Sequence, residues 1–497
     1  MPHTAPRDLT RGPIARTLFV FALPILAGNV LQSLNGSVNA VWVGRFLGEE
    51  ALAATANANN IMFFLIGAVF GVGMASTILV AQAMGARDLP RARRVIGTSA
   101  TFFLLVSVAI ALAGLPLSRA ILGWMGTPAA SLPLAEAYLR IIFVAVPLLY
   151  LFAFLSAVLR GAGDTRTPFA FLMLAVLLDI ALNPLLIFGV GPLPEMGIAG
   201  SAMATLLANG IALAALLAWL RHRRHPLWIA RSERAYFVPD TAILRALVAK
   251  GVPMGLQMVV ISLAMITMIS MVNAHGVDMT SAYGAALQLW TYVQMPAMAV
   301  GAACSSMAAQ NVGAGHWARV DATARTGVLF NFVLTGALIA PIVVFDRWTL
   351  ALFLPEASAA LDHARHLNHI AVWSFLFFGV TFVVSGVVRA TGAVLPPLLI
   401  LAVALWGIRV PFALLLQPAL GADAIWWSFP ASAVCAMLMS LAYYRWGNWR
   451  QARMLAGDPR EVAVPAEIPA QAPAPVADRC PEPVAAGQAP PRGHGPP

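Results

Sequence analysis

Residues 82–86 read Gln-Ala-Met-Gly-Ala and are followed by Arg91; 228 positions later, residues 310–314 read Gln-Asn-Val-Gly-Ala and are followed by Arg319. Each stretch comes at the end of a long apolar segment. A second set of landmarks recurs 229 positions apart, with Pro24, Arg160, Gly163 and Pro168 matched by Pro253, Arg389, Gly392 and Pro397. The chain therefore contains two copies of one pattern, at residues 15–218 and 244–445.

The composition places both copies in a membrane. Of the 497 residues, 60% are hydrophobic and only 10% are charged, whereas soluble domains carry about 25% charged residues. A hydrocarbon core about 30 Å thick requires about 20 apolar residues per helix. Twelve stretches meet this requirement, at residues 15–43, 52–80, 95–117, 138–160, 168–190, 197–220, 244–273, 281–309, 323–345, 368–389, 396–418 and 424–445.

The number of crossings decides how the two copies are related. Each copy crosses six times, an even number, so both copies start on the same side of the membrane. Such parallel repeats are related by an axis along the membrane normal. We therefore predict an all-α integral membrane protein whose twelve transmembrane helices form two six-helix lobes, related by a pseudo-two-fold axis, on either side of one central path. This is the layout of a transporter.

The net charge of +10 is also found in proteins that bind nucleic acid, so its distribution is decisive. Arginines are concentrated before the first helix, in alternate connections and after the last helix, whereas the other connections hold acidic residues such as Glu49, Glu195 and Asp423. Basic connections stay in the cytoplasm when a chain inserts into a membrane. We predict a multi-pass protein of the cell (inner or plasma) membrane with both termini cytoplasmic, in contact with membrane lipids and without a nucleic-acid partner.

Five segments follow from these boundaries. Residues 1–14 form a cytoplasmic N-terminus and residues 15–220 the N-lobe. Residues 221–243 form a basic cytoplasmic linker, whose arginines favour anionic lipid headgroups, and residues 244–445 form the C-lobe. Residues 446–497 are predicted to be a disordered cytoplasmic tail, because the sequence from about Gly457 is rich in Pro and Ala and has almost no large apolar side chains.

Four local motifs resemble one transporter family. They are Leu-Arg-Gly-Ala-Gly-Asp-Thr-Arg-Thr-Pro at 159–168, Leu-Asn-Pro-Leu-Leu-Ile-Phe-Gly at 182–189, Gly-Ile-Ala-Gly-Ser-Ala-Met-Ala-Thr at 197–205, and the paired Gln82/Gly85 and Gln310/Gly313. In this order, over roughly residues 10–450, the chain resembles the multidrug and toxic compound extrusion (MATE) transporters of the multidrug/oligosaccharidyl-lipid/polysaccharide flippase superfamily. The resemblance implies outward export of amphipathic, often cationic compounds, driven by inward flow of H⁺ or Na⁺.

The paired motif also has a purely structural interpretation. Gly85 and Gly313 end long helices, where glycine suits a left-handed cap. Arg91 and Arg319 would then lie on a short surface helix and meet lipid phosphates. We expect these four residues to form turns and anchors rather than to take part in transport.

Ionisable residues deep in a membrane are functional candidates, because each costs on the order of 3 kcal/mol to insert. Asp179 is the only acidic residue deep in any helix of the first copy, and Asn183 follows one turn later on the same side. Polar stripes also run along two other helices of this copy, formed by Gln32, Asn35 and Asn39, and by Thr205 and Asn209. The three stripes predict a small hydrated pocket in the N-lobe.

The resemblance also shows where this chain departs from its family. Many members carry an aspartate at the position of Asn39, and some relatives carry an acid at the position of Asn183 with an asparagine one turn earlier. Our hypothesis is that Asp179 alone supplies the titratable or Na⁺-binding carboxylate, and that Asn39, Asn183 and Thr205 are neutral oxygen ligands or hydrogen-bond partners. Burial favours the protonated form of a carboxylate, which suits proton exchange near neutral pH. The alternative is that Asp179 is a structural partner between helices.

The central path is expected to be lined by neutral polar and aromatic residues. Asn60 and Phe64 of the first copy match Gln288 and Tyr292 of the second. Matching positions of two parallel repeats lie on opposite sides of the pseudo-two-fold axis, so Asn60 and Gln288 can face each other. The predicted substrate cavity comprises Gln32, Asn35, Asn60, Asn209, Gln288 and Tyr292.

No hydrolytic chemistry is visible in the sequence. A Gly-rich phosphate loop with Lys is absent, so ATP is not expected to supply energy. We predict a secondary active antiporter rather than an enzyme, with no catalytic residue, metal site or cofactor, which exchanges small-molecule substrates for H⁺ or Na⁺ as a monomer. Two alternatives stay open: a flippase for a lipid-linked precursor, against which the scarcity of Arg in the path argues, and a membrane scaffold, which would not need Asp179.

Overall fold

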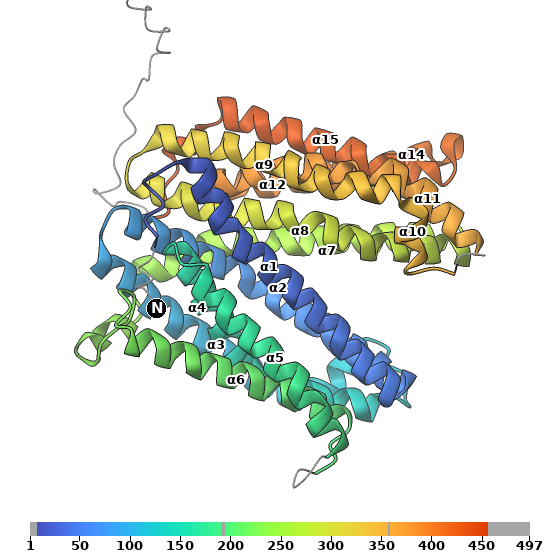
Figure 1. Cartoon of the computed structure of the whole chain (residues 1–497), viewed down its shortest axis with the longest axis horizontal. Coiled ribbons are helices and arrows are strands. Elements are labelled where there is room, and N and C mark those ends of the chain that lie inside the picture. The colour runs from blue at the N-terminus through green and yellow to red at the C-terminus, as the bar shows by residue number, and fades with distance from the viewer. Residues whose placement is uncertain (1–6, 190–193, 356–357, 456–497) are drawn as a thin grey trace, which may run out of the picture. The chain divides into compact units, whose positions relative to one another are not determined.

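The computed structural model describes residues 7–189, 194–355 and 358–455. In this part of the chain every long element is a helix (Figure 1). The first six helices form the N-lobe and are α1 (Ile14–Phe46), α2 (Glu49–Gly85), α3 (Leu89–Trp124), α4 (Leu132–Gly161), α5 (Arg166–Phe188) and α6 (Ile198–His222).

The C-lobe repeats this order with more interruptions. Its continuous helices are α7 (Thr241–Asn273), α8 (Val277–Gly313), α9 (Trp317–Val344) and α15 (Asp423–Trp446). Its fourth helix is divided into α11 (Ala359–Ala371) and α12 (Ser374–Arg389), and its fifth into α13 (Leu395–Ala402), the π-helical η2 (Val403–Arg409) and α14 (Val410–Leu420). The short elements are η1 (Arg231–Phe237) in the linker, α10 (Asp346–Ala351) before α11, and η3 (Asn448–Gln451) after α15.

Length and hydropathy support a membrane protein. Within the described residues, 9 spans are long and apolar enough to cross a membrane, or 10 when α11 and α12, bent by 45° at their junction, are counted as one. The second helices of the two lobes, α2 and α8, are not among them, but each is 37 residues long. Both pack on helices of their own lobe and on helices of the other lobe, α2 on α4 and α7, and α8 on α12 and α1. The predicted architecture of two six-helix lobes is confirmed.

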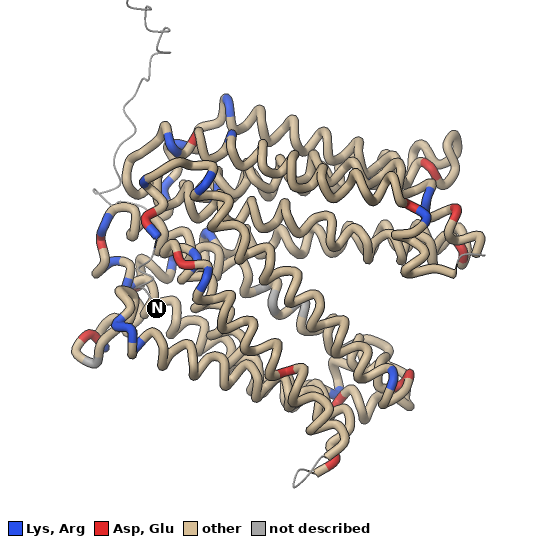
Figure 2. The backbone as a smooth tube through the Cα atoms, in the orientation of Figure 1, with Lys and Arg blue, Asp and Glu red and all other residues tan. Residues whose placement is uncertain are grey.

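Charged residues are concentrated at the ends of the helices. Figure 2 shows Lys and Arg gathered at the end of the bundle that holds the α2–α3 and α4–α5 connections. We call this end the basic end. The middle of the helices carries almost no charge, because a charged side chain is costly to place inside a membrane.

The two lobes meet at the basic end through a pair of equivalent contacts. The Gln82 Nε2 atom donates a hydrogen bond of 2.8 Å to the carbonyl oxygen of Ala390, and the Gln310 Nε2 atom donates one of 2.9 Å to that of Gly161. A Cβ atom on Gly85 would overlap the carbonyl oxygen of Gln310, and one on Gly313 would overlap that of Gln82. The repeated Gln and Gly residues are therefore the site where α2 and α8 cross at backbone contact.

This contact corrects the prediction of left-handed caps. Neither Gly85 nor Gly313 has a positive φ, and the residues that do are Arg87 at 57° and Gly315 at 73°, each two positions further on. Glycine is needed at 85 and 313 because no side chain fits between the helices, not because of backbone conformation. The sequence could not show this, since it depends on which helix lies opposite.

The arginines after these helices do not lie on a separate surface helix. Helix α3 begins at Leu89 and continues through the lobe, so Arg91 belongs to its first turn. The Arg319 side chain is held by the protein, because it donates to Asn311 Oδ1 at 3.2 Å and to the carbonyl oxygen of Gly12 at 3.1 Å. Its contact with a lipid phosphate stays a prediction.

The described part of the N-terminus lies across both lobes. The Leu9 N–H donates to Gln310 Oε1 at 3.1 Å, and the Leu9 carbonyl accepts from Asn311 Nδ2 at 3.2 Å. The Leu9 side chain is fully buried. This segment had been predicted only as a cytoplasmic extension, and it instead forms part of the closure between the lobes at the basic end.

The predicted tail begins later than expected. Trp449 in η3 is fully buried, and its carbonyl oxygen accepts a hydrogen bond of 2.8 Å from the Thr391 hydroxyl. Residues 446–455, assigned to the disordered tail, therefore pack on the C-lobe. The rest of the predicted tail lies outside the described residues.

Candidate functional site: a buried carboxylate in the N-lobe

Helix α5 places one carboxylate inside the N-lobe. The helix is apolar along its length, and its start is stabilised by Asp164, whose Oδ1 atom accepts the backbone N–H groups of Arg166 at 3.1 Å and Thr167 at 3.0 Å. Asp179 lies near the middle of this helix and is only 2% exposed. An ionised carboxylate at such a position requires partners that replace water.

Three neutral side chains provide those partners. The Asp179 Oδ1 atom accepts a hydrogen bond of 3.0 Å from the Thr205 hydroxyl of α6. The Asp179 Oδ2 atom accepts two hydrogen bonds of 3.0 Å from α1, one from Asn35 Nδ2 and one from Asn39 Nδ2. Side chains of α1 and α6 therefore converge on one carboxylate of α5.

Asn183 connects this arrangement to its own helix. Its Nδ2 atom donates to Asn39 Oδ1 at 2.8 Å and to the carbonyl oxygen of Asp179 at 2.9 Å, and its side chain is fully buried. Two buried amide oxygens, Asn35 Oδ1 and Asn183 Oδ1, have no hydrogen-bond donor. The site therefore has unused acceptors beside a carboxylate.

The electrostatics of the site favour a bound cation. No Lys, Arg or His among the described residues forms a hydrogen bond or ion pair with Asp179. A buried carboxylate whose partners are two amide N–H groups and one hydroxyl has no compensating positive charge, which suits a proton or a hard cation.

Comparisons with known proteins agree with this fold. The family model MatE matches residues 24–185 and 253–415, one stretch in each lobe. The chain is 38% identical over 432 residues to "Probable multidrug resistance protein YoeA" of Bacillus subtilis, covering 86% of this chain and 93% of the relative. The chain belongs to the MATE family. It is therefore a membrane transport protein, as the resemblance implied.

Two further known proteins are similar over nearly the same part of the chain. "Probable multidrug resistance protein YpnP" of Bacillus subtilis is 34% identical over 448 residues, covering 90% of this chain and 98% of the relative. A solved structure described as an "outward-facing conformation of a multidrug resistance MATE family transporter of the MOP superfamily" superposes with a TM-score of 0.81 at 21% identity. That match covers 89% of this chain and 98% of the solved one, and it supports the MATE fold.

The structure brings together the residues predicted for ion coupling in this MATE protein. Asp179, Asn183, Asn39 and Thr205 form one hydrogen-bonded group, although their role in coupling stays a prediction. Asn35 had been assigned to the substrate cavity, and its bond to the carboxylate places it in the same group. The spacing of four between Asn35 and Asn39 indicates that both side chains leave α1 on one face, but not that both reach α5.

The remaining predicted cavity residues are not brought together by hydrogen bonds. Gln32, Asn60 and Gln288 are exposed, and Tyr292 is half-buried. Asn209 donates to the carbonyl oxygen of Thr205 in its own helix at 2.9 Å and does not reach Asp179. For these five residues a role in binding substrate stays a prediction.

The C-lobe of this MATE protein holds an arginine in its interior, whereas the N-lobe holds a carboxylate. Arg409, at the end of η2, donates from Nε to Ser432 Oγ at 2.9 Å, and its guanidinium carbon lies 4.3 Å from the ring centre of Phe429. Both partners belong to α15, so the arginine is directed into the lobe.

Proposed function

We propose that this chain is a secondary active antiporter that exports amphipathic, cationic drugs or toxic metabolites in exchange for H⁺ or Na⁺ by alternating access. The names of YoeA and YpnP support drug export. The observation that carries ion coupling is the Asp179 carboxylate, buried in the N-lobe with only neutral oxygen and amide partners.

The coupling chemistry follows from this environment. Asp179 without a cation leaves a negative charge in a low-dielectric lobe, and a bound H⁺ or Na⁺ neutralises it. Asn35 and Asn183 each hold a buried oxygen without a donor, which can turn toward Na⁺. Binding and release of the ion therefore change the charge of the lobe. That change of charge can shift the balance between the inward-facing and outward-facing conformations.

The orientation of the chain gives this exchange a direction. We assign the basic end to the cytoplasm, because arginines are concentrated there (Figure 2). The lobes are joined at that end by the Gln82 and Gln310 bonds and by the segment around Leu9. The described state is then closed toward the cytoplasm, and release of substrate would occur on the other side. A single chain holds both lobes, so we propose a functional monomer.

Ethidium efflux from proteoliposomes tests this proposal. A pH gradient and a Na⁺ gradient are imposed separately on liposomes that contain wild type, Asp179→Asn or Asp278→Asn. Asp278 is the matched control because it is exposed in the first turn of α8. We expect one gradient to drive efflux in wild type and in Asp278→Asn, and not in Asp179→Asn.

Two results would contradict the proposal in different ways. Gradient-driven efflux that survives Asp179→Asn would keep the antiporter and remove the coupling role of the carboxylate. Transport of a lipid-linked precursor without dye efflux under either gradient would replace export by a flippase function.

A further inference from the structure

A pocket of about 380 Å³ lies at the basic end, away from the buried carboxylate. Its walls come from the N-terminal segment, from the first turns of α1 and from the α4–α5 connection, and include Arg7, Arg16, Val20, Phe21, Gly163, Asp164, Thr165 and Arg166. Asp179 is 13 residues further along α5 than Arg166, which corresponds to about 20 Å of helix. The pocket is therefore separate from the proposed ion site.

The N-terminal segment is fixed over this pocket. The Arg7 N–H donates to the carbonyl oxygen of Gly163 at 3.4 Å. Gly163 has a φ of 96°, and a Cβ atom there would overlap the carbonyl oxygen of Arg7. The backbone of Arg7 therefore rests directly on the α4–α5 connection, which positions its side chain at the pocket.

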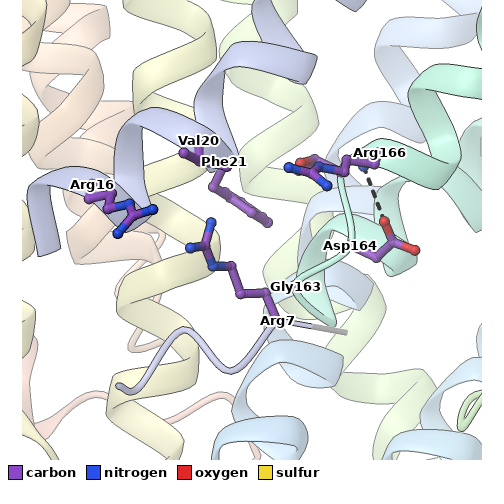
Figure 3. A pocket seen from close by; sticks show the side chains of 8 residues that line it. Arg7, Arg16, Val20, Phe21, Gly163, Asp164 and Arg166 are labelled. Atoms are coloured by element: carbon purple, nitrogen blue, oxygen red, sulfur yellow. Dashed lines mark hydrogen bonds between the residues drawn. The ribbon is translucent and has the colours of Figure 1, made fainter. Parts of the chain in front are cut away.

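Three guanidinium groups share the pocket. Figure 3 shows the side chains of Arg7, Arg16 and Arg166 directed toward the space beside Phe21. All three residues are exposed, and none forms an ion pair or side-chain hydrogen bond with another described residue. Like charges at one site repel each other unless an anion lies between them.

The one acidic residue of the pocket does not neutralise this charge. Asp164 is only 7% exposed, and its Oδ1 atom is engaged by the first backbone N–H groups of α5. Its Oδ2 atom is buried as well. Both oxygens are therefore turned away from solvent, and the accessible charge of the pocket is that of the arginines.

The matching position of the C-lobe lacks this set of charges. Leu395, 57% exposed, occupies the position 229 residues after Arg166. Gly392, the counterpart of Gly163, packs against the backbone of Arg453. Of the three arginines only Arg16 has an arginine counterpart, Arg245, which is exposed on α7. Lys250 brings a different cation to that position, where its Nζ atom donates to the carbonyl oxygen of Gly392 at 2.9 Å. The set of three arginines, rather than positive charge as such, is therefore particular to the N-lobe.

Apolar surface continues from the pocket along α1. Val20 and Phe21 form one wall, and Phe19 and Leu23 on the same helix are 46% and 52% exposed. A ligand that fits both features has a negatively charged group and a hydrocarbon part. Anionic lipids at a membrane surface have this chemistry, and basic residues near the surface attract them.

We propose that this pocket binds the phosphate group of an anionic membrane lipid, with Arg7, Arg16 and Arg166 as its ligands and the α1 surface at Phe19 and Leu23 as the contact for an acyl chain. Guanidinium groups bind phosphate oxygens through paired hydrogen bonds, which makes arginine well suited to this role. With the orientation proposed above, the lipid belongs to the cytoplasmic leaflet.

The test measures binding without transport, so its outcome is independent of the proposed antiport. Full-length protein is delipidated in detergent, and its melting temperature is followed as dioctanoyl phosphatidylglycerol, dioctanoyl phosphatidylcholine or inorganic phosphate is added. The variants are the double change Arg16→Gln with Arg166→Gln, the charge-preserving Arg16→Lys with Arg166→Lys, and Arg245→Gln as the matched control on α7.

We expect phosphatidylglycerol to stabilise wild type and Arg245→Gln with equal affinity. Its affinity for the double Gln variant should fall about fivefold for each arginine removed, and the double Lys variant should retain most of it. Equal affinity in the double Gln variant, or an equal effect of phosphatidylcholine, would overturn the proposal. Stabilisation by inorganic phosphate at the same concentration would overturn the lipid assignment and identify a soluble phosphate as the ligand.

Discussion

The two lobes are alike where they touch and different where they carry charge. At the basic end Gln82 and Gln310 make equivalent bonds to Ala390 and Gly161, two residues that are themselves 229 positions apart. In the interior, the N-lobe holds the carboxylate of Asp179, and the C-lobe holds the guanidinium of Arg409. The contact between the lobes is therefore the same from both sides, whereas the charged residue in the interior differs between them.

A change in helix geometry accompanies this divergence. Helix α5 is continuous, whereas its C-lobe counterpart passes through the π-helical η2. The offset between the copies rises from 229 at Pro168 and Pro397 to 232 at Gly189 and Gly421, which follow the last residues of the two helices. Extra residues within a helix are accommodated by π turns, which occur frequently at functional sites. The counterpart of Asp179 thus falls in the stretch that contains Arg409.

The polar partners of the carboxylate are also missing from the C-lobe. The positions 229 residues after Asn35 and Asn39 are Ala264 and Met268, each 1% exposed. An apolar pair cannot stabilise a buried charge. The comparison therefore favours the N-lobe for the proposed ion binding, and four predictions test how the lobes agree and differ.

The largest effect is expected from removing the two interior charges in turn. Asp179→Asn should lower ion-driven transport by about 100-fold or more, because a buried charge site of this kind contributes several kcal/mol. Arg409→Gln should leave the driving ion and the gradient dependence unchanged, since no ion ligand is lost. Initial rates of dye efflux under an imposed gradient measure both. Loss of gradient dependence in Arg409→Gln would place part of the coupling in the C-lobe.

A second prediction concerns the contact that the lobes share. Gly85→Ala and Gly313→Ala should destabilise the protein by similar amounts, about 1–3 kcal/mol each, because the new methyl group overlaps a backbone oxygen of the other lobe. Thermal unfolding in detergent provides the measurement. Gly284→Ala in α8 is the control, because open space surrounds its Cβ position. Strong destabilisation by only one of the two changes would contradict the equivalence of the contacts.

A third prediction separates two neighbouring residues of α1. Asn35→Ala removes an N–H donor that stabilises the ion-free carboxylate, so H⁺ should bind more tightly and the H⁺ concentration for half-maximal exchange should fall about tenfold. Gln32→Ala, one turn earlier and exposed, should leave it unchanged. Equal effects of the two changes would show that α1 contributes general polarity rather than a specific partner.

The smallest effect is expected for an acidic residue of the C-lobe at the end opposite to the basic one. Asp346, 6% exposed, accepts hydrogen bonds from Arg365 Nε at 2.8 Å and His369 Nε2 at 2.9 Å. Burial alone opposes ionisation, but these two bonds and the backbone N–H of Arg347 outweigh it and hold the pKa of Asp346 below its usual value. The stability that this carboxylate contributes is therefore complete above about pH 3.9 and is lost as the pH falls through its folded-state pKa.

Asp346 consequently stays ionised between pH 6 and 8. Asp346→Asn should leave the shape of the transport–pH profile unchanged in this range, so that any pH response there originates elsewhere, in line with coupling at Asp179. A profile displaced by Asp346→Asn would show that the C-lobe takes part in the pH response.

Much of the site could be predicted from sequence, and the rest depended on tertiary contacts. Asp179 stood out because an ionisable residue within an apolar segment is costly, and Asn39, Asn183 and Thr205 followed from helical spacing. The place of Asn35 beside the carboxylate could not be fixed in this way, because spacing defines a face of α1 but not the depth at which α5 crosses it.

The sequence by itself determined the number of helices, the two parallel copies and the position of the buried carboxylate. These features depend on hydrophobicity and repetition, which are properties of the chain read one segment at a time. The tertiary structure decided what lies opposite each segment. Only the tertiary structure shows that Gly85 and Gly313 are contact points between the lobes and that Leu9 helps to join the lobes at the basic end. It also shows that three arginines from separate segments meet in one pocket. Contacts between distant segments have no local signature, because the same residues would fit a turn, a terminus or a lipid surface equally well.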